Sequence, residues 1–345
     1  MAGSGERMIF EKIGTVPTAD ELVDKAFSRA VRAGRGKMGT EHTDRREIEE
    51  SMVLTAGNIL SDNLRHAARE WPSFERLPPF YRELADILAG VDRLRMALAS
   101  VTWAADKVRE ISRRYVATIR KSPDPVAARK QAFARMASIL KDIDKDLKFL
   151  NEARNRLREL PDVKDEPTIV VAGYPNVGKS SFVAAVTGAR PEIAPYPFTT
   201  KGVLIGHFVH DRQRYQVIDT PGLLDRPLSE RNDIERQAIT ALLYVGDALL
   251  FIIDPSEGCG YTLAEQEHLL AEVRRLVQVP VLVVASKIDL EHATAPADAC
   301  MSAKTGEGID DLVERLIRLA DGHKAGRAAL PGEEPPALPP SRKKK

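Results

Sequence analysis

A glycine-rich run over residues 173–180, GYPNVGKS, is the segment of this chain with the clearest chemistry. It follows the apolar stretch 168–172 and opens into the apolar segment 181–186, which predicts a strand, a loop and a helix in that order. The backbone N–H groups of such a loop surround nucleotide phosphates, and the ammonium of Lys179 contacts the β- and γ-phosphates. The residues assigned to the phosphates are Gly173, Tyr174, Pro175, Asn176, Val177, Gly178, Lys179, Ser180 and Ser181.

A second motif, Asp-Thr-Pro-Gly at residues 219–222, comes directly after a predicted strand. The Ser180 hydroxyl can bind Mg²⁺, the Asp219 carboxylate can hold the outer sphere of this ion, and the N–H of Gly222 can contact a γ-phosphate. The segment 196–202 lies between the two motifs, is polar and is interrupted by proline. It is typical of a switch loop in which one threonine binds Mg²⁺ only when a γ-phosphate is present.

The tripeptide Lys287-Ile288-Asp289 follows a strand predicted over residues 279–285. The Asp289 carboxylate can accept hydrogen bonds from both N1–H and the exocyclic amine of guanine. Adenine lacks this pair of donors, so ATP would leave the acceptor unpaired and be rejected. A backbone N–H of residues 302–304 can donate to guanine O6. The predicted ligands are therefore GTP and GDP, and the residues assigned to the base are Ser286, Lys287, Asp289, Ser302, Ala303 and Lys304.

In this order the motifs resemble those of the translation-factor-like branch of Ras-fold GTPases. Ser286 departs from that family, in which an asparagine carboxamide ties the guanine to the phosphate loop. A hydroxyl can make one of those contacts but not all, so we expect guanine preference to survive and affinity to fall by roughly 0.5–1.5 kcal/mol. The YPFTT segment is similar to that of Obg-type GTPases, which implies Thr200, with Thr199 second, as the Mg²⁺-binding switch threonine. The alternative is that the two threonines simply begin a strand.

Leu223 follows the second motif, at the place where Ras-like enzymes carry the glutamine that orients the attacking water. Leucine cannot hydrogen-bond water, so we expect slow intrinsic hydrolysis, on the order of 10⁻⁴ to 10⁻² s⁻¹. Some GTPases carry an asparagine at the position of Asn176 and an apolar residue at the position of Leu223, and they use K⁺ in place of an arginine finger. The chain resembles them at both positions. Alternatively, Asn176 only accommodates a left-handed turn. Catalysis is assigned to Lys179, Thr200 and Asn176, with Mg²⁺ and K⁺ as cofactors.

The 345 residues carry a net charge of +1, but the charge is unevenly distributed. Residues 1–160 hold 30 Lys and Arg against 24 Asp and Glu, whereas residues 161–345 hold 21 against 26. The basic first half favours contact with RNA, although it also fits an ordinary solvated surface. Cys259 and Cys300 lack CxxC spacing, and no apolar run is long enough to span a bilayer. We therefore expect no zinc site, no disulfide, no membrane and a cytoplasmic protein.

Residues 1–160 are assigned to a helical bundle domain, because the apolar period between residues 18 and 160 is helical, with stripes over 84–115 and 133–160. These stripes predict two long helices packed as an antiparallel hairpin inside a bundle. A linker is assigned to residues 161–167.

From residue 168 to 321, predicted strands alternate with helices. This pattern predicts a Ras-like P-loop domain of the α/β class, with a mostly parallel doubly wound sheet and with phosphate loops at the carboxyl ends of the strands. The last helix is expected to end near Ala320, and residues 322–345 to form a disordered basic tail.

Two segments, 16–22 and 223–239, are more specific than the generic motifs. They resemble the nucleolar GTP-binding protein 1 family, Obg-related GTPases with an N-terminal helical bundle, over roughly residues 8–320. The resemblance implies a slow switch in maturation of the large ribosomal subunit, with the bundle lying on rRNA, and a compact archaeal-type member. The expected partners are the large-subunit precursor and its rRNA, without DNA, and a monomer is expected.

Two other functions fit parts of the pattern. A P-loop ATP-dependent kinase or metabolic ATPase is disfavoured by Asp289 and by the lack of a second carboxylate cluster. A regulatory GTPase that docks a protein or a tRNA-related partner through its bundle remains open.

Overall fold

The computed structural model describes residues 9–37, 44–188, 191–197, 202–223, 230–290 and 296–329. The chain forms two compact units. The first combines the residues up to Leu77 with Leu88–Arg158, and the second combines Pro78–Ile87 with the residues from Glu159 onward.

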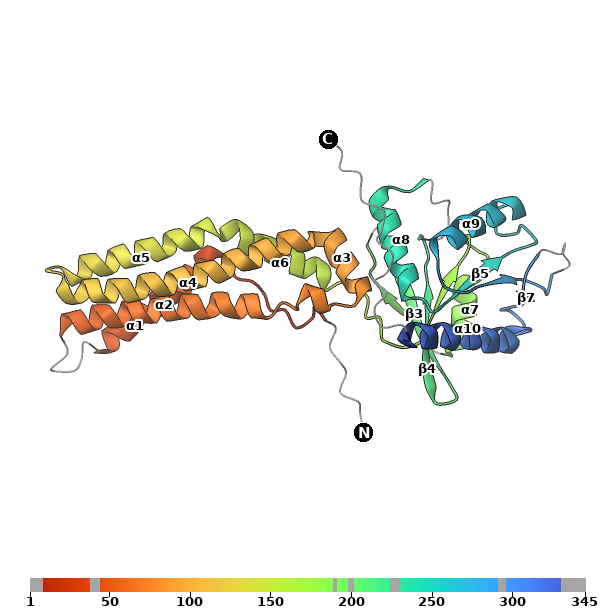
Figure 1. Ribbon diagram of the computed structural model, residues 1–345, viewed down its shortest axis with the longest axis horizontal. Helices are drawn as coiled ribbons and strands as arrows, with labels where there is room; N and C mark the ends of the chain where they lie inside the picture. The colour runs from red at the N-terminus through yellow and green to blue at the C-terminus, as the bar shows by residue number, and fades with distance from the viewer. Residues whose placement is uncertain are drawn as a thin grey trace. The chain divides into compact units, whose positions relative to one another are not determined.

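The first unit is a bundle of antiparallel helices, as predicted (Figure 1). Helix α2 packs on α1, α4 and α5, and α4 also packs on α5 and α6. Fully buried leucines, Ile119 and Met136 fill its core. Its elements are α1 (Ala19–Lys37), α2 (Arg45–Arg69), a 3₁₀ turn (Phe74–Arg76), α4 (Val91–Lys121), α5 (Pro125–Asp142) and α6 (Asp144–Leu157).

Both long apolar stripes are interrupted, so the prediction of two continuous helices is wrong. Helix α3 (Pro79–Ala89) ends before Gly90, whose φ of 77° lies in the left-handed region that an α-helix cannot continue through. The second stripe breaks at Ile143, between α5 and α6. There the Asp144 carboxylate accepts a hydrogen bond from the N–H of Ala19 at 3.1 Å, which ties the break to the start of α1.

The second unit contains a seven-stranded sheet in the order β2-β3-β4-β1-β5-β6-β7. The pairs β2–β3 and β3–β4 are antiparallel and the other four pairs are parallel, which confirms the predicted mostly parallel sheet. The strands are β1 (Thr168–Ala172), β2 (Glu192–Ala194), β3 (Val203–His210), β4 (Gln213–Asp219), β5 (Ala248–Ile253), β6 (Val281–Ala285) and β7 (Ala299–Cys300).

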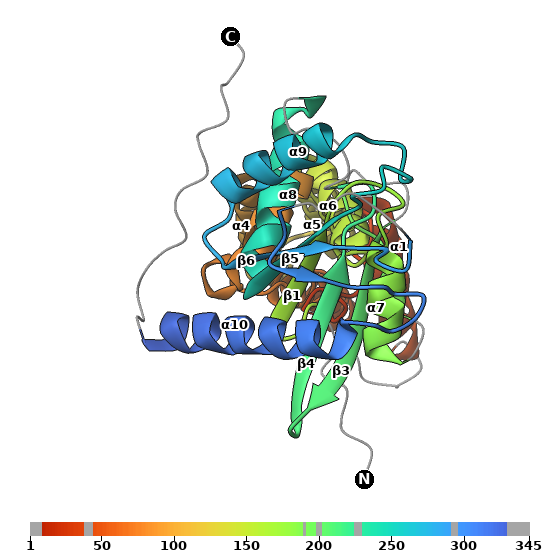
Figure 2. The same cartoon turned by 90° about the vertical axis from the view of Figure 1, so that its right-hand side faces the viewer.

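Helices cover both faces of this sheet, as Figure 2 shows. Helices α7 (Lys179–Thr187) and α10 (Ile309–Ala329) lie on one face, and α8 (Asp233–Val245) and α9 (Leu263–Leu276) on the other. Every residue of the central strands β1 and β5 is buried, because both of their faces are covered.

Helix α10 extends nine residues beyond its predicted end, so the expected tail is helical as far as Ala329. Among the described residues, two side-chain hydrogen bonds hold this extension to the second unit, and His323 lies 3.6 Å from Asp247. The Tyr215 hydroxyl donates to the Asp321 carboxylate at 2.9 Å, and the Lys324 ammonium donates to the Asp165 carboxylate at 3.0 Å. Residues 330–345 lie outside the part of the chain that the structure describes.

Candidate nucleotide-binding site

Parallel pairing brings the predicted motifs to one edge of the sheet. Val171 lies beside Asp219, Ala172 beside Phe251, and Ile253 beside Ala285. The segments that follow β1, β4, β5 and β6 therefore leave the sheet at the same edge, which is where doubly wound folds bind their ligands.

The glycine-rich segment forms a tight loop between β1 and α7. Gly173 has a φ of 135°, and a Cβ at this position would lie 2.4 Å from the carbonyl oxygen of Ile252, so only glycine fits. Gly178, with a φ of 107°, precedes the first turn of α7. The Lys179 side chain is buried, and its ammonium donates to the carbonyl oxygens of Gly173 at 2.9 Å and Tyr174 at 2.7 Å. The loop therefore holds the ammonium in place.

The other loop residues differ in exposure. Asn176 has a φ of 62° and is exposed, so the left-handed turn considered above is present. Val177 and Tyr174 are buried, and the Tyr174 ring stacks on that of Tyr261 with centroids 4.1 Å apart. Ser181 lies exposed in the first turn of α7.

Ser180 and Asp219 form the metal-binding candidate. The Ser180 hydroxyl donates to one Asp219 carboxylate oxygen at 2.7 Å. The other carboxylate oxygen is buried without a hydrogen-bond partner among the described residues. Burial raises the pKa of Asp219, although the hydrogen bond from Ser180 and the positive charge of Lys179 act to lower it. A buried, unpartnered carboxylate oxygen beside a hydroxyl fits Mg²⁺, which prefers oxygen ligands. Thr199 and Thr200 lie outside the described residues.

The residues after Asp219 differ in exposure, since Pro221 and Gly222 are half-buried and Leu223 is buried. The Leu223 side chain is fully buried, so it packs in the core and offers nothing to an attacking water. Arg231, which sequence reasoning did not assign to the site, is also buried, and its guanidinium donates to the carbonyl oxygen of Gly222 at 3.0 Å. Nothing in its local sequence distinguished it from an arginine on a helix surface.

The base-recognition candidates form a separate cluster. The Ser302 hydroxyl donates to an Asp289 carboxylate oxygen at 2.7 Å, and the Lys304 ammonium lies 4.0 Å from the other. The Ser302 N–H donates to the carbonyl oxygen of Glu307, which leaves the amides of Ala303 and Lys304 as candidates for guanine O6.

Ser286, which the sequence assigned to the base, is held by the neighbouring strand β5. Its hydroxyl donates to the carbonyl oxygen of Ile253 at 3.0 Å, and its N–H donates to the same oxygen at 2.8 Å. The hydroxyl therefore points back to β5, because this close backbone acceptor satisfies it inside the sheet.

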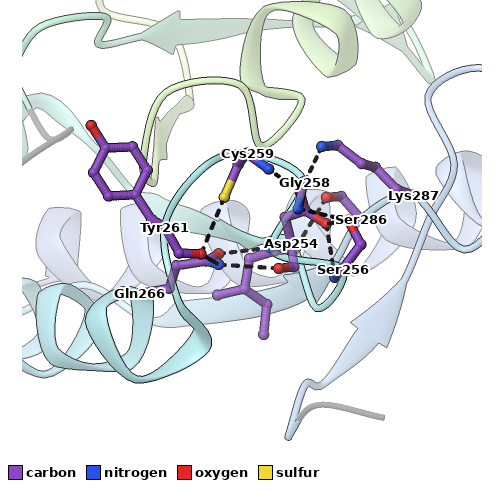
Figure 3. A network of polar contacts seen from close by, with 9 residues as sticks. Asp254, Ser256, Gly258, Cys259, Tyr261, Gln266, Ser286 and Lys287 are labelled. Carbon is purple, nitrogen blue, oxygen red and sulfur yellow. Dashed lines mark hydrogen bonds and ion pairs between the residues drawn. The ribbon is translucent and has the colours of Figure 1, made fainter. Parts of the chain in front are cut away.

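Asp254, at the end of β5, was also missed. Its carboxylate is fully buried and accepts a hydrogen bond from the Lys287 ammonium at 2.5 Å (Figure 3). Burial alone would raise the pKa of Asp254, but hydrogen bonds from Lys287 and Ser256 and the positive charge of Lys287 hold it below its usual value. The available signal was its position directly after an apolar strand, like that of Asp219.

Family comparison decides the identity of this arrangement. A model of the NOG1 N-terminal helical domain matches residues 10–164, and a model of nucleolar GTP-binding protein 1 (NOG1) matches residues 233–289. The chain belongs to the nucleolar GTP-binding protein 1 family. As a member of this family it is a GTPase.

Several relatives are similar over most of the chain. An uncharacterized protein of Methanocaldococcus jannaschii is 43% identical, covering 83% of this chain and 83% of that protein. The nucleolar GTP-binding protein 1 of Arabidopsis thaliana is 37% identical over 81% of this chain, and that of Caenorhabditis elegans 35% over 82%. This chain covers 43% of the length of each of these two. A crystal structure named for the Plasmodium falciparum nucleolar GTP-binding protein 1 is 33% identical over 49% of this chain and 94% of that one, with a TM-score of 0.43.

Across the ranges that the structure describes, no helix is long and apolar enough to cross a membrane.

Proposed function

We propose that this member of the family is a slow GTP-driven switch acting on the precursor of the large ribosomal subunit, with its bundle contacting rRNA. Lys179 and the loop amides hold the phosphates, Ser180, Thr200 and Asp219 take Mg²⁺, and Gly222 senses the γ-phosphate. Asp289 reads guanine. Loss of the γ-phosphate releases the segments around Thr200 and Gly222 and changes affinity for the particle, which must discriminate the two states. The eukaryotic relatives are named as nucleolar proteins, and the nucleolus is where ribosomal subunits are assembled, which supports the ribosomal role.

The observation that carries rRNA contact is the location of the basic excess in the bundle. Residues 29–50 and 113–135 carry 13 Lys and Arg against 6 Asp and Glu, whereas the rest of residues 1–160 carries 17 against 18. Residues 113–135 supply nearly all of this excess, with 7 Lys and Arg against 1 Asp, whereas residues 29–50 carry 6 against 5. Sequence counts alone could not show whether these stretches lie together.

The described parts of both stretches, residues 29–37, 44–50 and 113–135, lie at one end of the bundle, at the end of α1, the start of α2, the end of α4 and the start of α5 (Figure 1). The Arg46 guanidinium on α2 donates to the carbonyl oxygens of Arg120 and Ser122, each at 3.3 Å. Most cations here are exposed and, among the described residues, form no ion pair. These are Arg29, Arg32, Arg35, Arg45, Arg113, Arg114, Lys121, Lys130 and Arg135. Such a surface suits a phosphate backbone.

Charge reversal tests this surface. We expect Arg113→Glu with Arg114→Glu to lower the affinity for large ribosomal subunits at least about tenfold at moderate salt, and to reduce the salt slope of binding by about two. Binding is measured by co-sedimentation with a non-hydrolysable GTP analogue. The matched control is Lys141→Glu with Lys145→Glu, which makes the same charge change in the same unit on exposed residues away from the basic end.

Two results would count against the proposal. Equal losses in the two double variants would mean that total charge matters and the basic end does not. Association that survives removal of the rRNA would favour the second candidate, a regulatory GTPase that docks a protein or a tRNA-related partner through its bundle.

Potassium dependence is a separate part of the proposal. If Asn176 helps to hold K⁺ at the phosphates, we expect hydrolysis in KCl to exceed that in NaCl at equal ionic strength by about tenfold or more. Single-turnover phosphate release measures it, with Asn176→Gly as the variant that keeps the left-handed turn and loses the carboxamide. Equal rates in the two salts would limit Asn176 to its role in the turn.

We also propose a cytoplasmic monomer that works without DNA. The net charge is only +1, and the cationic surface is confined to the bundle, which is already assigned to rRNA. No second cationic surface is therefore proposed for DNA.

A further inference from the structure

The two halves of the nucleotide site are carried by strands that do not pair. The phosphate loop follows β1 and the base-recognition segment follows β6, with β5 between them. Ser286, at the place where the resemblance implies a tie between the halves, donates its hydroxyl to Ile253. Some other part of the chain must hold the two segments at the spacing of one nucleotide.

The segment after β5 reaches the base-recognition side through Asp254. The Asp254 carboxylate accepts from the backbone N–H groups of Ser256 at 3.0 Å and Cys259 at 2.9 Å, and from the Ser256 hydroxyl at 2.5 Å. The Lys287 ammonium donates to it at 2.5 Å, two residues before Asp289. Lys287 has a φ of 60°, a left-handed conformation that is uncommon for a side-chain-bearing residue and needs support from its surroundings.

The same segment reaches the phosphate loop through Tyr261. Gln266, fully buried on α9, receives the N–H of Asp254 at 2.7 Å and donates to the carbonyl oxygens of Asp254 at 3.1 Å and Tyr261 at 3.0 Å (Figure 3). Both ends of the segment are thus fixed to one side chain. The Tyr261 ring then stacks on Tyr174 of the phosphate loop, with centroids 4.1 Å apart and planes at 28°.

We propose that the segment Asp254–Tyr261 takes the place of the asparagine missing at position 286. Asp254 positions the base-recognition segment through Lys287, and Tyr261 positions the phosphate loop through Tyr174. These are positioning residues, because they act through groups that touch the nucleotide. The inference rests on the nucleotide site proposed above.

A double-mutant cycle tests the replacement. In the parent protein, Tyr261→Ala is expected to weaken GDP binding about three- to tenfold, because an aromatic stack of this kind is lost. In a Ser286→Asn background the same change is expected to cost less than about twofold, because the carboxamide supplies the tie. Dissociation constants come from titration with fluorescent GDP, and thermal unfolding checks that each variant is folded.

Two controls isolate the tie from general packing. Tyr261→Phe keeps the ring and is expected to bind GDP within about twofold of the parent. Phe208→Ala removes another stacked pair in the same unit, Phe208 on Tyr215 with centroids 5.2 Å apart, and is expected to leave GDP binding unchanged. If Tyr261→Ala does not fold, Tyr261→Leu replaces it under the same criteria.

The outcomes separate this inference from the site itself. Parent-like binding by Tyr261→Ala, or an equal loss in both backgrounds, overturns the inference while the site stands. If the parent does not bind GDP, or if Lys179→Ala binds GDP as tightly as the parent, the site and the inference fall together.

Discussion

Asp289→Asn is expected to lower GTP affinity about 100- to 1,000-fold and to make the protein accept xanthosine triphosphate. In the proposed site the Asp289 carboxylate would accept two hydrogen bonds from guanine, one from N1–H and one from the exocyclic amine. An asparagine amide can accept the first but presents its own N–H₂ to the amine, so two donors face each other. Xanthine carries a carbonyl oxygen at that place, which the amide can satisfy.

The surroundings of Asp289 favour a clean result. The Ser302 hydroxyl donates to the carboxylate at 2.7 Å and can donate equally to an amide oxygen, so the local structure should persist. Asp310→Asn, at an exposed position in the first turn of α10, is the matched control and should leave both affinities unchanged. Competition binding with GTP, ATP and xanthosine triphosphate measures the three affinities. Unchanged preference for GTP in Asp289→Asn would remove this residue from base recognition.

Lys179→Ala is expected to weaken GTP and GDP binding about 100-fold or more and to abolish measurable hydrolysis. The ammonium is the one group of the phosphate loop that carries a full positive charge, and the loop positions it through the carbonyl oxygens of Gly173 and Tyr174. In the proposed site its loss would remove charge-assisted hydrogen bonds to the β- and γ-phosphates. Both nucleotides contain a β-phosphate, so both should be affected.

Calorimetry with each nucleotide in Mg²⁺ gives the Lys179→Ala affinities. The control is Lys141→Ala, which removes an exposed lysine of the bundle and should leave the affinity for both nucleotides unchanged. Thermal unfolding checks that Lys179→Ala is folded. Parent-like binding would mean that the glycine-rich run is only a turn before a helix.

Local patterns were sufficient for the elements that build the loop. Neighbouring residues set each of these elements. An apolar run forms the strand at 168–172, Gly173 and Gly178 allow the positive φ values of the loop, and Lys179 begins the helix directly after it. The order of strands and helices in the second unit followed for the same reason. The roles of these residues toward the nucleotide stay predictions.

Periodicity alone did not find the helix breaks. The apolar stripe continues through Gly90 and through Ile143, because the buried face is kept on both sides of each break. At Gly90 the backbone enters the left-handed region, and at Ile143 the neighbouring Asp144 is bound to the start of α1, which is 125 residues away in sequence. Only the packed bundle decides such a contact.

The sequence by itself determined that this chain has a glycine-rich run, an Asp-Thr-Pro-Gly motif and a Lys-Ile-Asp tripeptide, because each is a short run of residues. Tertiary structure decided which side chains support them. Asp254 and Lys287 are 33 residues apart and meet because β5 and β6 lie side by side in parallel. The same pairing places the carbonyl oxygen of Ile253 next to Ser286, so its hydroxyl bonds there. Partner choice in a buried site depends on which groups the fold brings within hydrogen-bonding distance, and local sequence does not carry that information.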